Sequence, residues 1–133
     1  MRIARELIDE VVAHAREEAP NECCGLIGGA DGRAHRIFRA RNSEASPFRY
    51  VVDPRDQIRI MTEIEDLGEE LVAIYHSHTR SAAYPSPTDV NLADGWPDPL
   101  YLICSLAADP PDVRAFAIRD GAIDEVALAV EER

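Results

Sequence analysis

Apolar residues recur with helical spacing in two parts of the chain. The first pattern predicts a surface helix over residues 4–18, which Pro20 ends. Its apolar positions are Leu7, Ile8, Val11, Val12 and Ala15. The second helix is expected to begin at Asp53-Pro54, an N-cap followed by a first-turn proline, and to end at Gly68. We expect it to continue with one apolar face through Ile58, Met61, Ile64, Glu65 and Leu67. Its solvated side is expected to carry Glu63, Glu65, Asp66, Glu69 and Glu70.

Runs of β-branched and apolar residues predict the strands. They cover residues 24–29, 33–39, 48–52, 71–75, 100–106, 113–119 and 122–130. The Asp31-Gly32 and Asp120-Gly121 turns are expected to close two hairpins. A short helix is expected after Ser86. This order of elements predicts an α/β (α+β) fold, in which helices flank a mixed sheet whose central strand, residues 71–75, ends at two histidines.

Length and composition fit one soluble globular domain over residues 1–133. The chain is 46% hydrophobic and 29% charged, and it is long enough to bury a core without disulfides. It has no apolar run near the roughly 20 residues of a membrane span. Its start, Met1-Arg-Ile-Ala-Arg-Glu6, lacks the apolar core of a signal peptide. We therefore expect a cytoplasmic protein with no membrane partner.

Charge and cysteine content narrow the function classes further. The net charge of -11 repels phosphate backbones, so nucleic acid is a poor partner. The three cysteines form no disulfide framework, which suits a reducing compartment. Cys24 and Cys104 lie in apolar runs, where packing is the simplest role.

The segment YHSHTRSAAYPSPTD, residues 75–89, contains a candidate metal site. Side chains at i and i+2 of a strand share a face, so His76 and His78 can reach a common centre. Asp89 follows eleven residues later, far enough for the loop to return a carboxylate from the next helix. Two imidazoles and one carboxylate leave a fourth position for water, which is the pattern of a catalytic zinc.

The same segment has an explanation without a metal. Ser86-Pro87-Thr88-Asp89 reads as a capping box with Ser86 as N-cap, proline at N1 and Asp89 at N3. A His-x-His pair also occurs in many strands by chance. The spacing alone leaves both explanations open.

A hydrolytic zinc site needs a base near the metal, and the candidate is Glu22. It follows a helix-ending proline and precedes an apolar strand, so it would lie at the end of the sheet. The alternative is an ordinary solvated glutamate in a loop.

Three segments together resemble the active-site pattern of the JAMM metalloproteases, also called the MPN-plus family. They are Pro20-x-Glu22-x-Cys24-Gly25-Leu26, Tyr75-His76-Ser77-His78 and Pro85-Ser86-x-x-Asp89. A glutamate combined with His-x-His-x(7)-Ser-x-x-Asp is the whole active-site pattern of that family. Residues 42–54 also resemble the family's lead-in to its second helix, so the resemblance covers nearly the entire chain. It implies an MPN/JAMM-like fold with a curved mixed sheet, an architecture similar to that of cytidine deaminases.

The resemblance also implies a role for each matching residue. His76, His78 and Asp89 would bind one Zn²⁺, with water as the fourth ligand. Glu22 would act as general acid/base, taking a proton from the zinc-bound water and passing one to the leaving amine. Ser86 would donate a hydrogen bond to the oxyanion. The same residue could cap the helix, serve the oxyanion, or do both.

The family cleaves amide or isopeptide bonds after the C-terminal Gly-Gly of ubiquitin or ubiquitin-like proteins. This compact chain has no room for the insertions of its eukaryotic relatives, so the resemblance implies a small β-grasp partner. Many members have proline after the second histidine, whereas this chain has Thr79. His-Ser-His-Thr is similar to bacterial members that act on sulfur-carrier proteins. The leaving group would be cysteine or a lysine side chain.

Two other functions stay open. An MPN-type scaffold without metal would serve protein interaction, although such relatives typically lose the histidines or the aspartate. A zinc hydrolase of another class, such as a deaminase, would share the fold, but the chain has no Pro-Cys-x-x-Cys ligand pair. Outside the site, we expect His14 to be exposed, His35 to have no ligand role and Trp96 to cover the core.

Overall fold

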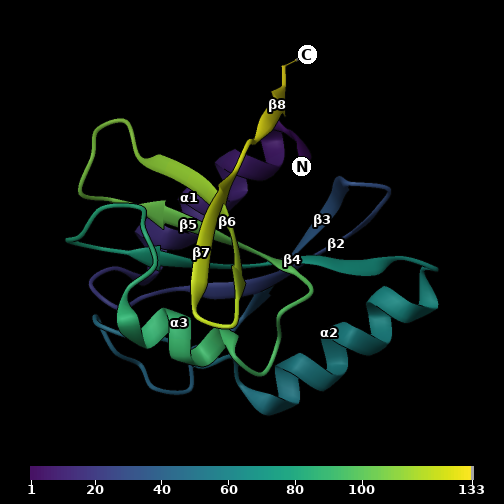
Figure 1. The fold of residues 1–133 in the computed structure, drawn as a ribbon, viewed down its shortest axis with the longest axis horizontal. Helices are drawn as coiled ribbons and strands as arrows, with labels where there is room; N and C mark the ends of the chain where they lie inside the picture. Colours follow the sequence, from purple (N-terminus) through teal and green to yellow (C-terminus); the bar gives the residue numbers. More distant parts are fainter. Residues whose placement is uncertain (133) are drawn as a thin grey trace.

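The computed structural model describes residues 1–132, which form one eight-stranded sheet and three helices (Figure 1). The helices are α1 (Arg5–Glu18), α2 (Pro54–Asp66) and α3 (Pro87–Ala93). The strands are β1 (Arg2–Ala4), β2 (Cys24–Ala30), β3 (Arg33–Ala40), β4 (Glu70–His78), β5 (Leu100–Ser105), β6 (Asp112–Arg119), β7 (Ala122–Val126) and β8 (Ala129–Glu131). None of the helices within these residues is long and apolar enough to cross a membrane.

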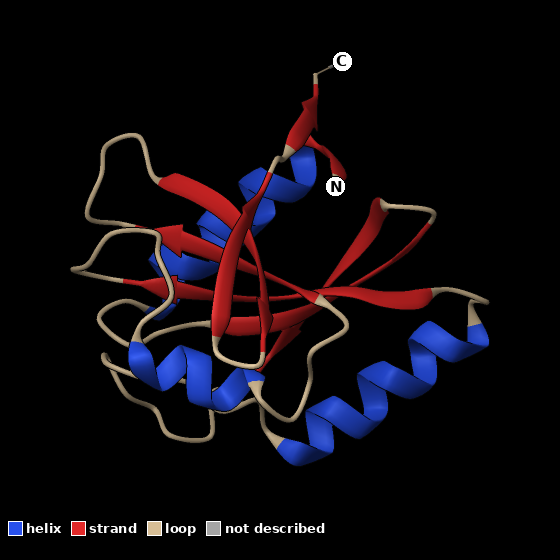
Figure 2. Cartoon of the chain, in the orientation of Figure 1, coloured by secondary structure: helices blue, strands red, loops and turns tan. Residues whose placement is uncertain are grey.

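The sheet is mixed, with the order β7-β6-β5-β4-β2-β3-β1-β8, and helices lie on both of its faces (Figure 2). Helix α1 lies behind the strands in Figure 2, whereas α2 and α3 lie on the other side. Two apolar cores match these layers, one containing Val11 of α1 and the other containing Ile60 of α2 and Ala93 of α3. Strand β4 is central and lies antiparallel to β2 and parallel to β5. The predicted mixed sheet flanked by helices is therefore confirmed.

The alternation of side chains along β4 divides the two cores. Tyr75 belongs to the core under α1, whereas Ile74 belongs to the core under α2 and α3. His76 and His78 continue the face of Ile74, because side chains two residues apart on a strand share a face. The end of β4 thus directs both histidines towards the layer that contains α3.

The predicted strand over residues 48–52 is wrong, because this segment forms a loop. Its one β-contact is an isolated bridge between Asn42 and Val52. The Asn42 side chain accepts a hydrogen bond from Val51 N and donates one to Arg49 O, and so occupies groups that a partner strand would need. Phe48 is 75% exposed, so its apolar side chain did not indicate burial.

The predicted strand over residues 122–130 divides into β7 and β8. Strand β7 closes the hairpin with β6, whereas β8 pairs in parallel with β1 at the opposite edge of the sheet (Figure 1). Strand β1 was not predicted at all. Strands β1 and β8 have only three residues each, and their pairing joins distant parts of the chain, so no local sequence pattern predicts it.

The ends of α2 are as expected, but its buried face is not. The Asp53 carboxylate accepts hydrogen bonds from Arg55 N and Asp56 N, and Pro54 opens the helix. Ile60 and Ile64 are buried, whereas Ile58 is 70% exposed and Leu67 is also exposed. Glu69, expected on the solvated side, accepts hydrogen bonds from His35 and Arg36.

The expectation that His14 is exposed is also wrong. Its side chain is buried on α1, and His14 Nδ1 lies 2.7 Å from the Tyr75 hydroxyl. Burial, together with the charge of Arg39, lowers the pKa of His14 to about 4. The folded protein therefore holds this imidazole neutral in a pH range where an unfolded chain protonates it.

This burial makes the fold sensitive to acid. The contribution of His14 to stability is present above pH 6.5 and is lost as the pH falls towards about 4. Over that window the loss is at most about 3 kcal/mol. We expect His14→Gln, which keeps a polar partner for Tyr75 but does not titrate, to show a smaller loss of unfolding free energy in denaturant titrations from pH 7 to pH 4.5. Equal slopes for the variant and the wild type would contradict this account.

Candidate metal centre

Strand β4 ends with two histidines whose ring nitrogens converge. His76 Nε2 and His78 Nε2 lie 3.3 Å apart, as their shared face predicts. His78 Nδ1 lies 2.8 Å from Ala82 O, and a carbonyl oxygen only accepts, so this nitrogen carries the proton. His78 Nε2 of the neutral ring therefore has a free lone pair. Ser77 points to the other face, where its Oγ accepts a hydrogen bond from Cys23 N at 2.8 Å.

Helix α3 brings Asp89 to the same point. Asp89 Oδ2 lies 3.1 Å from His76 Nε2 and 2.9 Å from His78 Nε2. The predicted capping box is also present, because Asp89 N donates to Ser86 Oγ and Ser86 N donates to Asp89 Oδ2. The two explanations of residues 75–89 are thus compatible. The cap fixes the first turn that aims the carboxylate at the histidines.

These three side chains fit a divalent cation. Their donor atoms all lie within 4.8 Å of one another, and all three residues are buried. A neutral His78 turns the Nε2 lone pair towards a carboxylate oxygen, and two lone pairs at this distance repel unless positive charge lies between them. Two imidazole nitrogens and one carboxylate oxygen are typical zinc ligands, and they leave a fourth position for water.

The charge states of the three residues agree with this fit. Burial would raise the pKa of Asp89, but without a metal the protonated forms of the two histidines donate hydrogen bonds to it, and these hold its pKa well below its usual range. Burial lowers the pKa of His76. Burial also acts to lower the pKa of His78, but its bonds to Asp89 and Ala82 raise it overall. The carboxylate therefore stays anionic at any working pH, as a metal ligand must.

Tyr50 forms the wall behind His76. The two rings are stacked, with centroids 4.2 Å apart and an angle of 20° between their planes. His76 Nδ1 is buried without a hydrogen-bond partner in the described residues, so ring packing holds this side of the imidazole while Nε2 faces Asp89. Tyr50 was not predicted as a site residue, because residues 48–52 were expected to form a strand.

Glu22 lies beside the histidines rather than on the solvated surface. It is only 4% exposed, and Glu22 Oε1 has no hydrogen-bond partner among residues 1–132. Burial raises the pKa of Glu22 to about 8, with the charge of His78 acting against this rise and that of Asp89 adding to it. A carboxyl group with a pKa near the working pH is suited to take up and return a proton.

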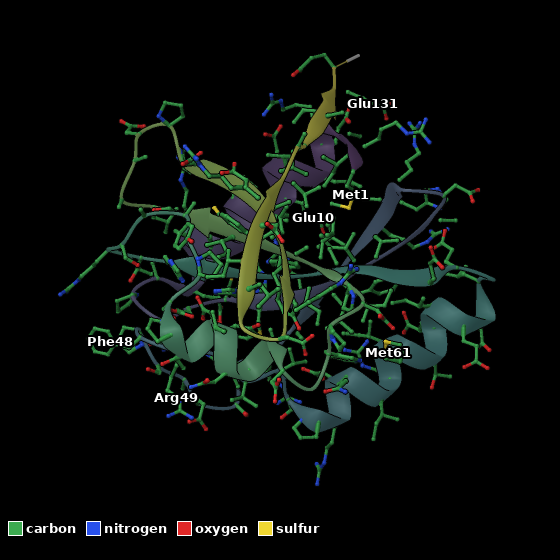
Figure 3. All side chains as sticks on the ribbon, viewed as in Figure 1. Met1, Glu10, Phe48, Arg49, Met61 and Glu131 are labelled. Atoms are coloured by element: carbon green, nitrogen blue, oxygen red, sulfur yellow. The ribbon has the colours of Figure 1, made fainter. Side chains whose placement is uncertain are left out.

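One cavity joins these groups to the surface. Its volume is about 220 Å³, and its walls include Glu22, His78 and Ser86 from the candidate site. The outer walls are Pro47, Phe48, Thr79, Arg80 and Ser81. Figure 3 shows Phe48 and Arg49 projecting outwards from the loop between β3 and α2. The cavity is thus an entrance from the surface to Glu22 and to His78.

The cysteines, Trp96 and His35 have structural rather than catalytic surroundings. All three cysteines are buried and free, and burial raises the pKa of Cys23 to about 12 and that of Cys104 to about 11. Such thiols are protonated at neutral pH, which agrees with packing roles. Trp96 packs against the core of α2 and α3, as expected. His35 bonds to Glu69, away from the candidate site.

Comparisons with known proteins agree on one family. A family model described as prokaryotic homologs of the JAB domain matches residues 4–119. The CysO-cysteine peptidase of Mycobacterium tuberculosis is 41% identical over 135 residues, covering 98% of this chain and 91% of the relative. The probable TtuB-protein conjugate cleaving protease of Thermus thermophilus is 37% identical over 129 residues, covering 96% of this chain and 81% of the relative.

Solved structures show the same fold. Protein DSY2949 from Desulfitobacterium hafniense has a TM-score of 0.90 and 34% identity, with 100% of this chain and 94% of that chain covered. AF2198, a JAB1/MPN domain protein from Archaeoglobus fulgidus, has a TM-score of 0.67 with 98% of both chains covered. Its identity is 18%, so this similarity supports the fold alone.

Proposed function

Because the chain belongs to the prokaryotic JAB branch of the JAMM/MPN family, we propose that it is a zinc-dependent peptidase. Its substrate would be the amide bond after the C-terminal Gly-Gly of a small ubiquitin-like or sulfur-carrier protein. The observation that carries this proposal is the buried His76, His78 and Asp89 group beside Glu22. A metal-binding trio next to a carboxyl group of raised pKa is what metal-assisted hydrolysis requires.

The residues divide the chemistry between them. His76, His78 and Asp89 would hold Zn²⁺, which when bound supplies a Lewis acid that polarises a carbonyl group and lowers the pKa of water. Glu22 accepts the proton of the attacking water and then delivers a proton to the leaving amine, so that the amide bond breaks without releasing an unprotonated amine anion. The low exposure of Glu22 keeps bulk water away from this transfer.

Ser86 can cap α3 and serve the reaction at the same time. Capping uses an Oγ lone pair, which accepts from Asp89 N at 3.1 Å, and leaves the hydroxyl proton free to donate. Ser86 also lines the cavity beside Glu22 and His78. Its hydroxyl would therefore stabilise the oxyanion that develops in the transition state.

Replacement of this hydroxyl should separate the two roles. We expect Ser86→Ala to lower kcat about 10²- to 10³-fold, as for loss of one oxyanion donor. The lost cap should cost only about 1 kcal/mol of unfolding free energy. Ser86→Thr, which keeps a hydroxyl, is the matched control and should retain most activity. Steady-state kinetics and thermal melts of both variants test this, and equal kcat values for Ser86→Ala and wild type would exclude the oxyanion role.

Two relatives suggest two leaving groups. One is named for a CysO-cysteine bond and the other for TtuB-protein conjugates. The cavity of about 220 Å³ ends at the buried Glu22 and His78, and glycine has no side chain to accommodate there, which favours a glycine-rich tail. We therefore propose a flexible Gly-Gly tail whose amide partner is either a single cysteine or the lysine side chain of a tagged protein.

The deciding experiment combines metal analysis with two substrates. A ubiquitin-like protein is extended after Gly-Gly by cysteine in the first, and joined through Gly-Gly to a lysine side chain in the second. We expect one zinc per chain, hydrolysis that a chelator stops and zinc restores, and little cleavage when valine replaces both glycines. A chain that binds no zinc and cleaves neither substrate would overturn the proposal and favour a metal-free interaction scaffold.

A further inference from the structure

The carboxylate of Glu22 is held in place by its backbone rather than by its side chain. Glu22 Oε1 has no hydrogen-bond partner among the described residues. The main chain, by contrast, is anchored on both sides, because Glu22 N donates to Ser46 O at 2.9 Å and Glu22 O accepts from Asn42 Nδ2 at 3.2 Å. The next amide, Cys23 N, donates to Ser77 Oγ between the two histidines. The position of the base therefore depends on these three anchors.

Two of the three anchors come from the segment between β3 and α2, and Asn42 organises it. The half-buried Asn42 carboxamide makes four hydrogen bonds, which use both of its donors and both of its acceptor lone pairs. Its Oδ1 accepts from Glu44 N at 3.1 Å and Val51 N at 3.0 Å. Its Nδ2 donates to Arg49 O at 2.9 Å and to Glu22 O. One side chain thus closes the loop of residues 43–51 on itself and ties it to the base.

The same loop also supports the candidate metal centre. It carries Tyr50, whose ring is stacked on His76, and Ser46, whose carbonyl oxygen holds Glu22 N. Movement of this loop would displace the base and the wall behind a metal ligand together. Asn42 itself does not line the cavity, so it has no direct contact with a reacting group there.

We infer that Asn42 is a positioning residue for the reaction, which couples the loop of residues 43–51 to Glu22 and so fixes the base relative to the histidines. This inference rests on the proposed function. An asparagine is required because the site needs two donors and two acceptors on one planar group. An aspartate would keep the acceptors for Glu44 N and Val51 N but would turn an oxygen towards two carbonyl oxygens.

Two variants of Asn42 distinguish the role of its acceptor oxygen from the role of its donor nitrogen. We expect Asn42→Asp to lower kcat about 10- to 100-fold, a typical cost of a small misplacement of a catalytic group. Its KM should change by less than about threefold, because two of the three hydrogen bonds that close the loop, those from Glu44 N and Val51 N, remain. Hydrogen exchange should accelerate at Glu22 N but not at Val51 N or Glu44 N. In Asn42→Ala, all three amides should exchange faster and kcat should fall at least as far.

Two controls match these changes. Asn91→Asp makes the same chemical change at an exposed position of α3, and Ser43→Ala removes a hydrogen bond from Ser43 Oγ to Val51 O that does not reach Glu22. Both should retain wild-type kcat and Glu22 N protection.

The inference is overturned if Asn42→Asp keeps kcat within about twofold of the wild type, or if Glu22 N protection is unchanged. If Asn42→Ala does not fold, the kcat and the Glu22 N exchange of Asn42→Asp alone test the inference. A wild-type chain without zinc-dependent hydrolysis would instead refute the proposed function, and the exchange of Glu22 N would then decide the coupling alone.

Discussion

Glu22→Gln is expected to lower kcat about 10²- to 10⁴-fold while zinc binding is retained, because loss of a general acid/base has this effect. Glutamine has nearly the same size and shape as glutamate but cannot accept the proton of the attacking water. Glu22 is not one of the three clustered donor residues, so its loss leaves the metal ligands in place. Metal content by elemental analysis and single-turnover hydrolysis of a Gly-Gly-linked conjugate measure the two effects separately.

The matched control is Glu18→Gln, four residues earlier and exposed. It should leave both kcat and zinc content unchanged. If Glu22→Gln hydrolyses the conjugate at the wild-type rate, another group must be the base and the proposed mechanism is wrong. If it loses zinc as well, Glu22 supports the metal rather than the proton transfer.

The same substitution should change the stability of the metal-free protein. Burial raises the pKa of Glu22 from 4.5 to about 8, so the folded protein holds this proton more tightly than the unfolded chain. The resulting stability is present below pH 4.5 and is lost as the pH rises through about 8. Glu22→Gln removes this dependence, so its unfolding free energy should fall less over this range than that of the wild type. A buried carboxyl group with a raised pKa in the wall of a cavity is typical of a functional site, although its burial costs stability.

The elements that the sequence predicted well carry local signals. The helix of α1 follows from apolar spacing, and the hairpin of β2 and β3 follows from the Asp31-Gly32 turn, where both residues have positive φ. The elements that it missed depend on distant partners. The parallel pair of β1 and β8 joins the two ends of the chain, and no window of sequence contains both strands.

The candidate site shows the same division. His76, His78 and Asp89 were predicted because strand alternation and a capping box fix their directions locally. Asn42 and Tyr50 were not, because their roles arise only when a loop folds back onto the start of β2 and the end of β4. His14 was missed for a similar reason, since its partner Tyr75 is 61 residues away. Polar side chains that form hydrogen bonds to residues distant in the sequence leave no periodic pattern that would predict them.

Asp89→Asn is expected to reduce zinc affinity by at least about 100-fold, because loss even of a residue that only orients a ligand costs about 10- to 100-fold. The variant tests whether the capping box and the metal ligand are separable roles of one carboxylate. Asparagine keeps an oxygen that can accept from Ser86 N, as Asp89 Oδ2 does at 2.9 Å, but it lacks the negative charge that a zinc ligand supplies. Asp89→Ala removes both functions.

Three measurements distinguish the roles. Zinc at 100 times its dissociation constant should stabilise the wild type by about 2.7 kcal/mol and should stabilise neither variant to this extent. Hydrogen exchange at the start of α3 should stay slow in Asp89→Asn and become faster in Asp89→Ala. Asp94→Asn, at the exposed C-cap of the same helix, should behave as the wild type in both assays. If Asp89→Asn binds zinc as tightly as the wild type, the carboxylate is a helix cap only, and the metal site needs another third ligand.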